Sequence, residues 1–271
     1  MKRSLYSVVG ILVVIVWAFP VYWMATTAVK PGRDMFAAVP QMVPLHPTLA
    51  NFSRVLDDPI FWQAARNSVI VSACAVALAM VVAFLAALAV ARFPFAGRRT
   101  FLVVVMVVQM IPHVAIVIPI FLTLGDLQLA DTLPGLVVSY LAFALPFAIW
   151  TLRGFVAGVP RELEEAALID GCSRMQAFRR ITLPLIFPGL VATSIYTMIL
   201  AWNEYLLTYF LISSPDKYTL PLWLTHFVGT EGTEFGPLMA GATLIAIPVA
   251  VFFAIVQRHL ARGLTAGAVK G

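Results

Sequence analysis

The chain has 271 residues, and its composition excludes a water-soluble globular domain. Hydrophobic residues make up 61% of the chain and charged residues 11%, whereas a soluble domain carries roughly 25% charged residues. A globule of this size cannot bury so much apolar surface, so we expect lipid as the solvent and no nucleic-acid partner despite the net charge of +5. Two cysteines, Cys74 and Cys172, are too few for a disulfide framework.

Six apolar segments are each long enough to cross a hydrocarbon layer of about 30 Å. In chain order, the predicted spans are residues 5–28, 68–91, 101–124, 133–152, 185–212 and 237–257. The first could imitate a cleaved secretory signal, but it is longer than the apolar core of about 7–15 residues that such signals have. We therefore predict an all-α integral membrane protein with six transmembrane helices, forming a single domain over residues 1–271.

The distribution of Lys and Arg orients the spans. With the N-terminus inside, 13 of these residues fall in inside segments and 5 in outside loops, which is the bias that the positive-inside rule describes. The short loop that holds Asp126 and Asp131 has no basic residue and falls outside. Both termini and the polar segment between the fourth and fifth spans are therefore predicted to be cytoplasmic.

That polar segment contains signals for two short helices. Pro160 suits a first helical turn, the glutamates that follow lie near its positive end, and Gly171 suits its C-terminus. Ser173 and Gln176 have the spacing of a capping box, so a second helix should begin at once. Pro184 would then mark the junction with the fifth span.

Two interpretations of this helical pair remain open on pattern alone. Leu163, Ala166, Ala167 and Asp170 recur at helical spacing, giving one face of mostly small apolar side chains. The pair could rest on the lipid headgroups as an amphipathic hairpin, which the pattern alone favours. Alternatively, the alanine face could insert into a groove on another protein.

The spacing within this segment favours docking on another protein. Glu165-Ala166-Ala167, then Gly171 after three intervening residues and Ile181-x-Leu183-Pro184 after nine more intervening residues, resemble the cytoplasmic signature of ATP-binding-cassette importer permeases. In that family the segment is a coupling helix that inserts into a cleft on a cytoplasmic ATPase subunit. The resemblance implies an ATPase-coupling role for Glu165, Ala166, Ala167, Gly171, Ile181, Leu183 and Pro184.

The resemblance covers essentially the whole chain, and in two segments it is to one subfamily in particular. Ala201-Trp202-Asn203-Glu204 and the tail from Gly263 to Gly271 are similar to carbohydrate-uptake permeases, in particular the maltose-type G subunit. This implies the type I importer fold, with a five-helix core over about residues 63–257 and an extra N-terminal span. Residues 158–184 would form the coupling helices, and residues 258–271 a cytoplasmic tail. The ATPase-contacting residues of that tail would be Thr265, Ala266 and Gly267.

The same resemblance implies the partners. They are a second, unlike permease, two cytoplasmic ATPase subunits and an extracytoplasmic sugar-binding protein, in a bacterial or archaeal plasma membrane. The chain has no G-x-x-x-x-G-K-[ST] phosphate loop and no metal-spaced histidines, so we expect a transport subunit that is not an enzyme and holds no cofactor or metal. ATP and magnesium would be bound by the partner ATPase.

The predicted substrate pathway includes Trp202, Asn203 and Glu204. Glu204 is the one acidic residue predicted deep in a span, where a carboxylate costs roughly 2.5–3.5 kcal/mol and usually faces a polar interior. The alternative interpretation of Glu204, which the sequence leaves equally open, is a structural ion pair or hydrogen bond to another helix or subunit. Trp202 could stack on a sugar ring, although aromatic residues in spans more often serve packing.

These observations predict an importer of a di- or oligosaccharide, and they leave alternatives. The same machine could carry glycerol phosphate or another polyol, because such permeases look similar in these motifs. A transporter driven by an ion gradient would need intramembrane charged relays, for which the chain offers only Glu204. A purely structural scaffold would leave the alanine-faced segment without a role.

Overall fold

The computed structural model describes residues 2–230 and 232–267, with side chains for residues 6–230 and 232–255. The fold is helical apart from a short hairpin that pairs β1 with β2 in antiparallel register. The elements are α1 (Lys2–Ala28), α2 (Gly32–Met35), α3 (Ala50–Leu56), α4 (Pro59–Arg92), α5 (Arg98–Met110), α6 (His113–Asp126), α7 (Leu133–Gly158), α8 (Arg161–Ile169), α9 (Arg174–Ala177), the π-helix η1 (Phe178–Thr182), α10 (Leu183–Trp202), α11 (Leu206–Leu211), the 3₁₀ helices η2 (Pro215–Lys217) and η3 (Leu224–Phe227), α12 (Leu220–Trp223), β1 (Val228–Gly229), β2 (Gly232–Thr233) and α13 (Phe235–Gly267).

Within the described residues, five helices are long and apolar enough to cross a membrane, and a bent pair adds a sixth. They are Tyr6–Ala28, Pro59–Arg92, Leu133–Gly158, Arg174–Trp202 and Phe235–Ile255, with Arg98–Met110 and His113–Asp126 as the bent pair. The predicted helical membrane class is confirmed. The long α4 begins nine residues before the predicted second span because Asp58 caps it, accepting a hydrogen bond from Ile60 N at 2.9 Å.

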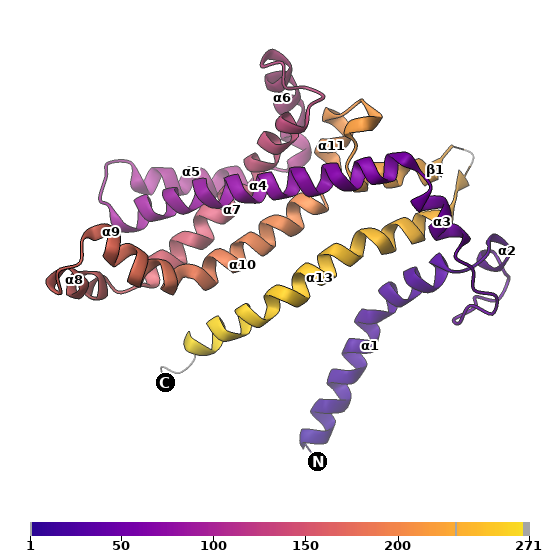
Figure 1. The fold of residues 1–271 in the computed structure, drawn as a ribbon, viewed down its shortest axis with the longest axis horizontal. Helices are drawn as coiled ribbons and strands as arrows, with labels where there is room; N and C mark the ends of the chain where they lie inside the picture. The colour runs from indigo at the N-terminus through magenta and orange to yellow at the C-terminus, as the bar shows by residue number, and fades with distance from the viewer. Residues whose placement is uncertain (1, 231, 268–271) are drawn as a thin grey trace.

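The third predicted span, residues 101–124, is wrong as a single straight helix. α5 and α6 meet at an angle of 104°, and Figure 1 shows α6 turned away from α5. Ile111 and Pro112 at the junction have extended backbone. Proline has no N–H to donate and disfavours helical backbone in the residue before it, so the helix breaks there.

The fifth predicted span, residues 185–212, is wrong at both ends. The helix already begins at Arg174 and runs through η1 into α10, so Pro184 is not a junction. In a regular α-helix, the ring of Pro184 would clash with the carbonyl group of Arg180, and Pro184 has no N–H to bond to it. The helix is wider here: Leu183 N donates to Phe178 O, five residues earlier, which is the hydrogen bond of a π turn. At the other end α10 stops at Trp202, and a break over residues 203–205 precedes α11.

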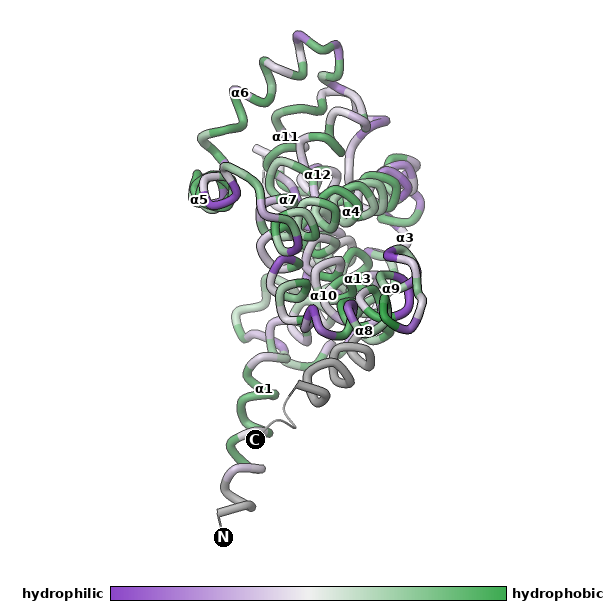
Figure 2. The backbone as a smooth tube through the Cα atoms, turned by 90° about the vertical axis from the view of Figure 1, so that its left-hand side faces the viewer, coloured by the Kyte–Doolittle hydropathy of each residue, from purple (hydrophilic) through white to green (hydrophobic). Residues whose placement is uncertain are grey.

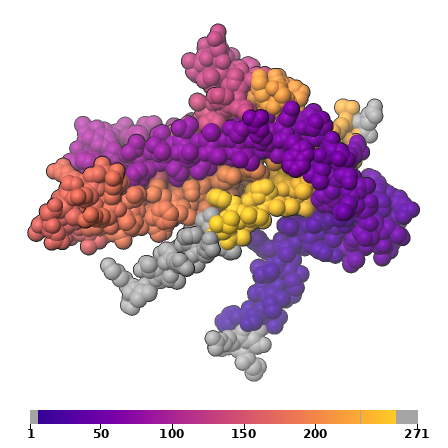
Figure 3. Space-filling view, viewed as in Figure 1, coloured from indigo at the N-terminus to yellow at the C-terminus, as the bar shows by residue number. Residues whose placement is uncertain are grey.

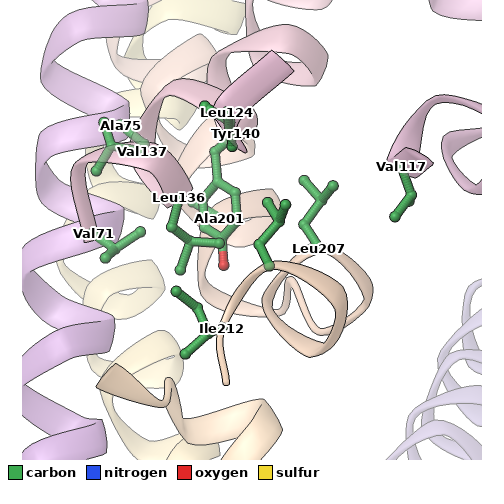
Figure 4. Packing of buried hydrophobic residues seen from close by; sticks show 11 residues of the cluster. Val71, Ala75, Val117, Leu124, Leu136, Val137, Tyr140, Ala201, Leu207 and Ile212 are labelled. Atoms are coloured by element: carbon green, nitrogen blue, oxygen red, sulfur yellow. The ribbon is translucent and has the colours of Figure 1, made fainter. Parts of the chain in front are cut away.

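The core is built on close contact between α4 and α7, which lie side by side with α10 packed against both (Figure 1). Ala75, Ala79, Ala83 and Ala87 form a stripe of fully buried small side chains along α4. Small residues at four-residue spacing let neighbouring helix backbones approach closely. Near the α10–α11 break, Tyr140 is surrounded by buried aliphatic side chains of α4, α7 and α11 (Figure 4).

The N-terminal span is attached mainly at its outer end. α1 packs against α13, yet none of its most apolar window is buried, and in the space-filling view its described part extends away from the body (Figure 3). At the outer end, Lys30 is 2% exposed. Its ammonium group donates to Gln41 O at 2.6 Å and lies 4.3 Å from the centre of a Trp23 ring. α1 is therefore anchored outside the core.

The outside loops are fastened by Asp131. Its carboxylate accepts hydrogen bonds from Ser213 N, from the backbone and hydroxyl of Ser214, and from Lys217 Nζ at 2.9 Å. Partial burial raises the pKa of Asp131, but these donors lower it more, so the pKa lies well below its ordinary value. The loop after α6 is thereby joined to the loop after α11.

Gly135 on α7 provides a stability test. A Cβ there would lie 2.1 Å from the backbone oxygen of Leu129, which cannot move aside, whereas a Cβ at Gly154 on the same helix meets nothing within 4 Å. We expect Gly135→Ala to destabilise the protein by about 1–3 kcal/mol, and Gly154→Ala to be neutral or slightly stabilising. Thermal unfolding in detergent measures both; equal melting temperatures for the two variants would contradict the close approach.

The bonds of Asp131 predict a pH dependence. A carboxyl whose pKa is depressed in the folded state contributes stability above its unfolded pKa, near 3.8, and that contribution is lost as the pH falls through the folded value. We expect the melting temperature of Asp131→Asn to be lower than that of the wild type by about 2–4 °C between pH 5 and 8, with the gap narrowing below pH 4. A gap that widens on acidification would be the opposite result.

Candidate functional site

The end of the bundle that the sequence predicts to be cytoplasmic carries α8, whose C-terminus is set by Gly171. Gly171 has a φ of +84°, which favours glycine. Its N–H donates to Leu168 O at 3.1 Å, and Cys172 N donates to Ala167 O at 2.9 Å. These two bonds form a Schellman motif. The sequence prediction that Gly171 ends this helix is confirmed.

The next helix starts two residues later through the predicted capping box. Gln176 N donates to Ser173 Oγ at 3.3 Å, and Ser173 N donates to Gln176 Oε1 at 2.8 Å. α9 is only four residues long and continues directly into η1 and α10. The predicted second helix of the pair is therefore the beginning of the fifth span, and not a separate surface helix.

α8 has an exposed face and a face turned toward the bundle. Ile169 is 86% exposed and Leu163 43%, and Glu165 and Ala166 are also exposed. Ala167 is 6% exposed, so it is not on the outer alanine face that the sequence suggested. Figure 2 looks toward this end of the molecule, where hydrophilic residues gather around α8 and α9.

The inner face of α8 is bonded to the body of the protein through Arg92, at the end of α4. Arg92 Nη2 lies 2.8 Å from Glu164 Oε1, and both terminal nitrogens donate to Val159 O at 3.1 Å. Thr182 Oγ1 donates to the same oxygen of Glu164 at 2.7 Å. Arg161 Nη2 donates to the backbone oxygen of Arg92 at 3.1 Å. We call these five residues the Arg92 cluster.

The remaining residues of the signature lie in or beside η1. Ile181 and Leu183 are half-buried and Pro184 is exposed. They are separated from the exposed face of α8 by the chain reversal at Gly171. A cavity of about 470 Å³ lies between α8, α9 and the end of α4, and its lining includes Glu165, Arg174 and Phe178.

A second cavity, of about 400 Å³, lies at the α10–α11 break. Asn203, Glu204 and Tyr205 line it together with Tyr140 of α7 and His113 of α6. Two helix interruptions, the one before His113 and the one after Trp202, meet at this cavity. Irregular backbone at membrane depth is tolerated where it lines a cavity or is buried in protein.

The three predicted pathway residues are not all brought together. Trp202 is 2% exposed, its indole N–H donates to Ile245 O at 3.2 Å, and it does not line this cavity. Glu204 lies at the break instead of inside a helix. Its carboxylate accepts from Leu207 N at 3.0 Å and from Thr208 N at 3.3 Å, so it caps α11.

Asn203 is the exposed member of this group. Its side-chain amide nitrogen donates to Ile199 O at 2.8 Å, which fixes the amide against the last turn of α10. The tail residues Thr265, Ala266 and Gly267 lie outside the residues whose side chains the structure describes.

Sequence reasoning missed Arg92, Glu164 and Thr182. Arg92 was noted only as an inside charge, Glu164 only as one of the glutamates near the start of α8, and Thr182 is the variable position between Ile181 and Leu183. One signal could have found Arg92: a cation directly after a long apolar helix needs an anionic or carbonyl partner near the membrane surface.

The fold and site define a multi-pass membrane protein with a polar helical segment between two spans, which presents an exposed face. Residues 75–266 match the family described as the binding-protein-dependent transport system inner membrane component. The chain belongs to this family, and it is a multi-pass inner membrane subunit of a transporter.

Curated relatives match over their whole length. The chain is 44% identical to the diacetylchitobiose uptake system permease protein DasC of Streptomyces coelicolor, over 100% of both chains. It is 36% identical to the trehalose transport system permease protein SugB of Mycobacterium tuberculosis, over 100% of this chain and 98% of that one. It is 32% identical to the trehalose/maltose permease MalG of Thermococcus litoralis, with the same coverage.

Solved structures agree on the fold. A bacterial ABC transporter that imports the acidic polysaccharide alginate matches with a TM-score of 0.78 and 21% identity, over 95% of both chains. The MetNI methionine ABC transporter matches with a TM-score of 0.60 and 18% identity, over 79% of this chain and 98% of that one. The fold is therefore that of a type I ABC importer permease.

Proposed function

We propose that this chain is one half of the membrane pathway of an ATP-driven importer of uncharged di- or oligosaccharides. It works with a second, unlike permease and an extracytoplasmic sugar-binding protein in a bacterial or archaeal membrane. Two cytoplasmic ATPase subunits bind ATP and magnesium and drive the cycle. The three relatives named above, which are permeases for diacetylchitobiose, trehalose and trehalose/maltose uptake, support a sugar as the cargo.

The observation that carries the proposal is the exposure of apolar side chains among charged ones on α8. Leu163 and Ile169 are both exposed, and the helix lies at the end of the molecule that the positive-inside rule places in the cytoplasm. A short helix with exposed apolar side chains can fit a groove on another protein. The ATPase subunit is that partner.

Some residues of the signature contact the ATPase, and others set the local backbone geometry of the docking segment. Ala166 contacts the ATPase directly, because it is exposed on the outer face, and so does Glu165, whose side chain is exposed although it also lines the cavity between α8 and α9. Ala167 and Gly171 act by shape: the buried alanine allows close packing, and the glycine reverses the chain. Ile181, Leu183 and Pro184 keep the π turn that joins the docking segment to α10. The tail residues Thr265, Ala266 and Gly267 reach the ATPase dimer.

The cavity at the α10–α11 break forms part of the sugar pathway. Its lining residues include Asn203, Tyr205 and Tyr140 but no lysine or arginine, and its one carboxylate, Glu204, is used in capping α11. A phosphate or carboxylate cargo would need a cation there. Aromatic faces and amide groups suit a neutral sugar, so the glycerol-phosphate alternative is disfavoured.

Docking through α8 predicts the effect of one substitution. Ile169→Glu places a charge in the outer face at a position that is already in water, so folding should be unaffected. We expect co-purification with the cognate ATPase to fall at least tenfold, together with uptake. Leu127→Glu, at an apolar site that is also exposed but lies after α6, away from α8, is the control and should retain the ATPase. Normal ATPase recovery with Ile169→Glu would refute docking through this face.

The sugar pathway predicts a second effect. Asn203→Ala removes a hydrogen-bonding group from the cavity and should lower uptake of the transported sugar about tenfold, the equivalent of one hydrogen bond of roughly 1.4 kcal/mol, with ATPase assembly unchanged. Gln109→Ala removes an exposed amide from α5 outside this cavity and serves as the control. Uptake by reconstituted proteoliposomes measures both; equal uptake by the two variants would remove Asn203 from the pathway.

A further inference from the structure

We propose that Arg92, Glu164 and Thr182 form the connection through which movement of α8 reaches α4 and α10 during transport. The proposal rests on the proposed function, in which an ATPase subunit holds the outer face of α8. It assigns these residues a positioning role: they do not contact the ATPase or the sugar, but make the docking helix and the membrane helices move together.

The covalent chain alone holds α8 loosely. It joins the body through Val159 and Pro160 before the helix and through residues 170–173 after it. Two short connections of this kind let a helix tilt about the line between them. The polar bonds of the Arg92 cluster are therefore what prevents tilting of α8 relative to its neighbours.

The bonds reach the ends of α4 and α7 and the turn before α10. The Arg92 guanidinium, at the end of α4, bonds both to Glu164 on α8 and to the backbone oxygen of Val159, which follows α7. Glu164 then accepts a hydrogen bond from Thr182, in the turn before α10. One oxygen of one carboxylate thus links α4 and α10 to the docking helix.

Arg92 and Thr182 are largely buried and Glu164 is half-buried, which limits the screening of these bonds by water. The side chain of Arg92 is 10% exposed and that of Glu164 is 29%, and Thr182 is 1% exposed. Below them lies an apolar cluster that includes Ala91, Val156 and Ile186. A charged pair against such a surface is poorly screened by water, and the loss of one partner leaves the other charge uncompensated.

Two successive glutamates on α8 make different contacts, although both line the cavity between α8, α9 and the end of α4. Glu164 pairs with Arg92, whereas Glu165 is exposed and lies about 100° further around the helix. The outer face can therefore bind the ATPase while the inner face remains bonded to the membrane helices. Transmission of movement requires that α8 be bonded to the membrane helices as well as to the ATPase, whereas docking alone requires only the bond to the ATPase.

The test is Glu164→Gln in the complete complex, reconstituted in proteoliposomes with its ATPase and binding protein. Gln keeps the size of the side chain but loses the charge that pairs with Arg92. We expect normal ATPase co-purification and ATP hydrolysis, and about a tenfold fall in sugar taken up per ATP hydrolysed, within the range seen for substitutions in coupled networks. Thr182→Val, which removes only the hydroxyl donor, should lower the same ratio by a smaller factor.

Asp126→Asn is the control, because it removes a carboxylate charge from an exposed position at the end of α6, away from α8 and its docking face, and should leave the ratio unchanged. An unchanged ratio in Glu164→Gln would overturn the connection. So would a parallel loss of ATPase binding, hydrolysis and uptake, because that pattern belongs to a role in folding alone. If the wild-type chain neither bound nor activated an ATPase, the proposed function would fail, and the connection with it.

Discussion

Every backbone N–H and C=O that lies at membrane depth needs a partner inside the protein, and this constraint explains where the polar side chains are found. The helix break after Trp202 frees N–H groups at the start of α11, and the Glu204 carboxylate accepts two of them. The carbonyl of Val159, freed where α7 ends, receives both terminal nitrogens of Arg92. Charged side chains inside or beside the bundle thus compensate for interruptions in the helices, and both candidate sites lie at such interruptions.

The lipid-facing surface explains how much of the fold could be predicted. The predicted spans agree with the structure where an apolar run forms one helix, as in α7 and α13, because hydropathy measures the free energy of transferring side chains from water to lipid. It does not measure where a helix bends. Pro112 lies within the third predicted span, and proline interrupts helices, but the angle of 104° depends on how α6 packs against α11 and α7. The break after Trp202 has no proline and could not be predicted from hydropathy.

The site was predictable to the extent that its determinants are local. Gly171, Ser173 and Gln176 act on residues within five positions, and their cap geometry is as predicted. The Arg92 cluster depends on contacts between residues 67, 69, 72 and 18 positions apart. The predicted face of α8 was also incomplete, because helical spacing identifies which residues share a face but not which face turns toward the bundle. Burial of Ala167 and the ion pair of Glu164 decide that question.

The π turn of η1 has a consequence for the evolution and engineering of the docking segment. A π turn contains one residue more than an α turn, so it rotates everything before it by about 100° relative to an uninterrupted helix. Ala177 of α9 and Thr182 of η1 are both buried. The extra residue of the π turn allows both side chains to face the protein interior. Removing one residue from η1 would leave composition and hydropathy almost unchanged while turning α9 and the attached α8 to a different side of the molecule. We therefore expect η1 to tolerate most side-chain substitutions better than the insertion or deletion of a residue.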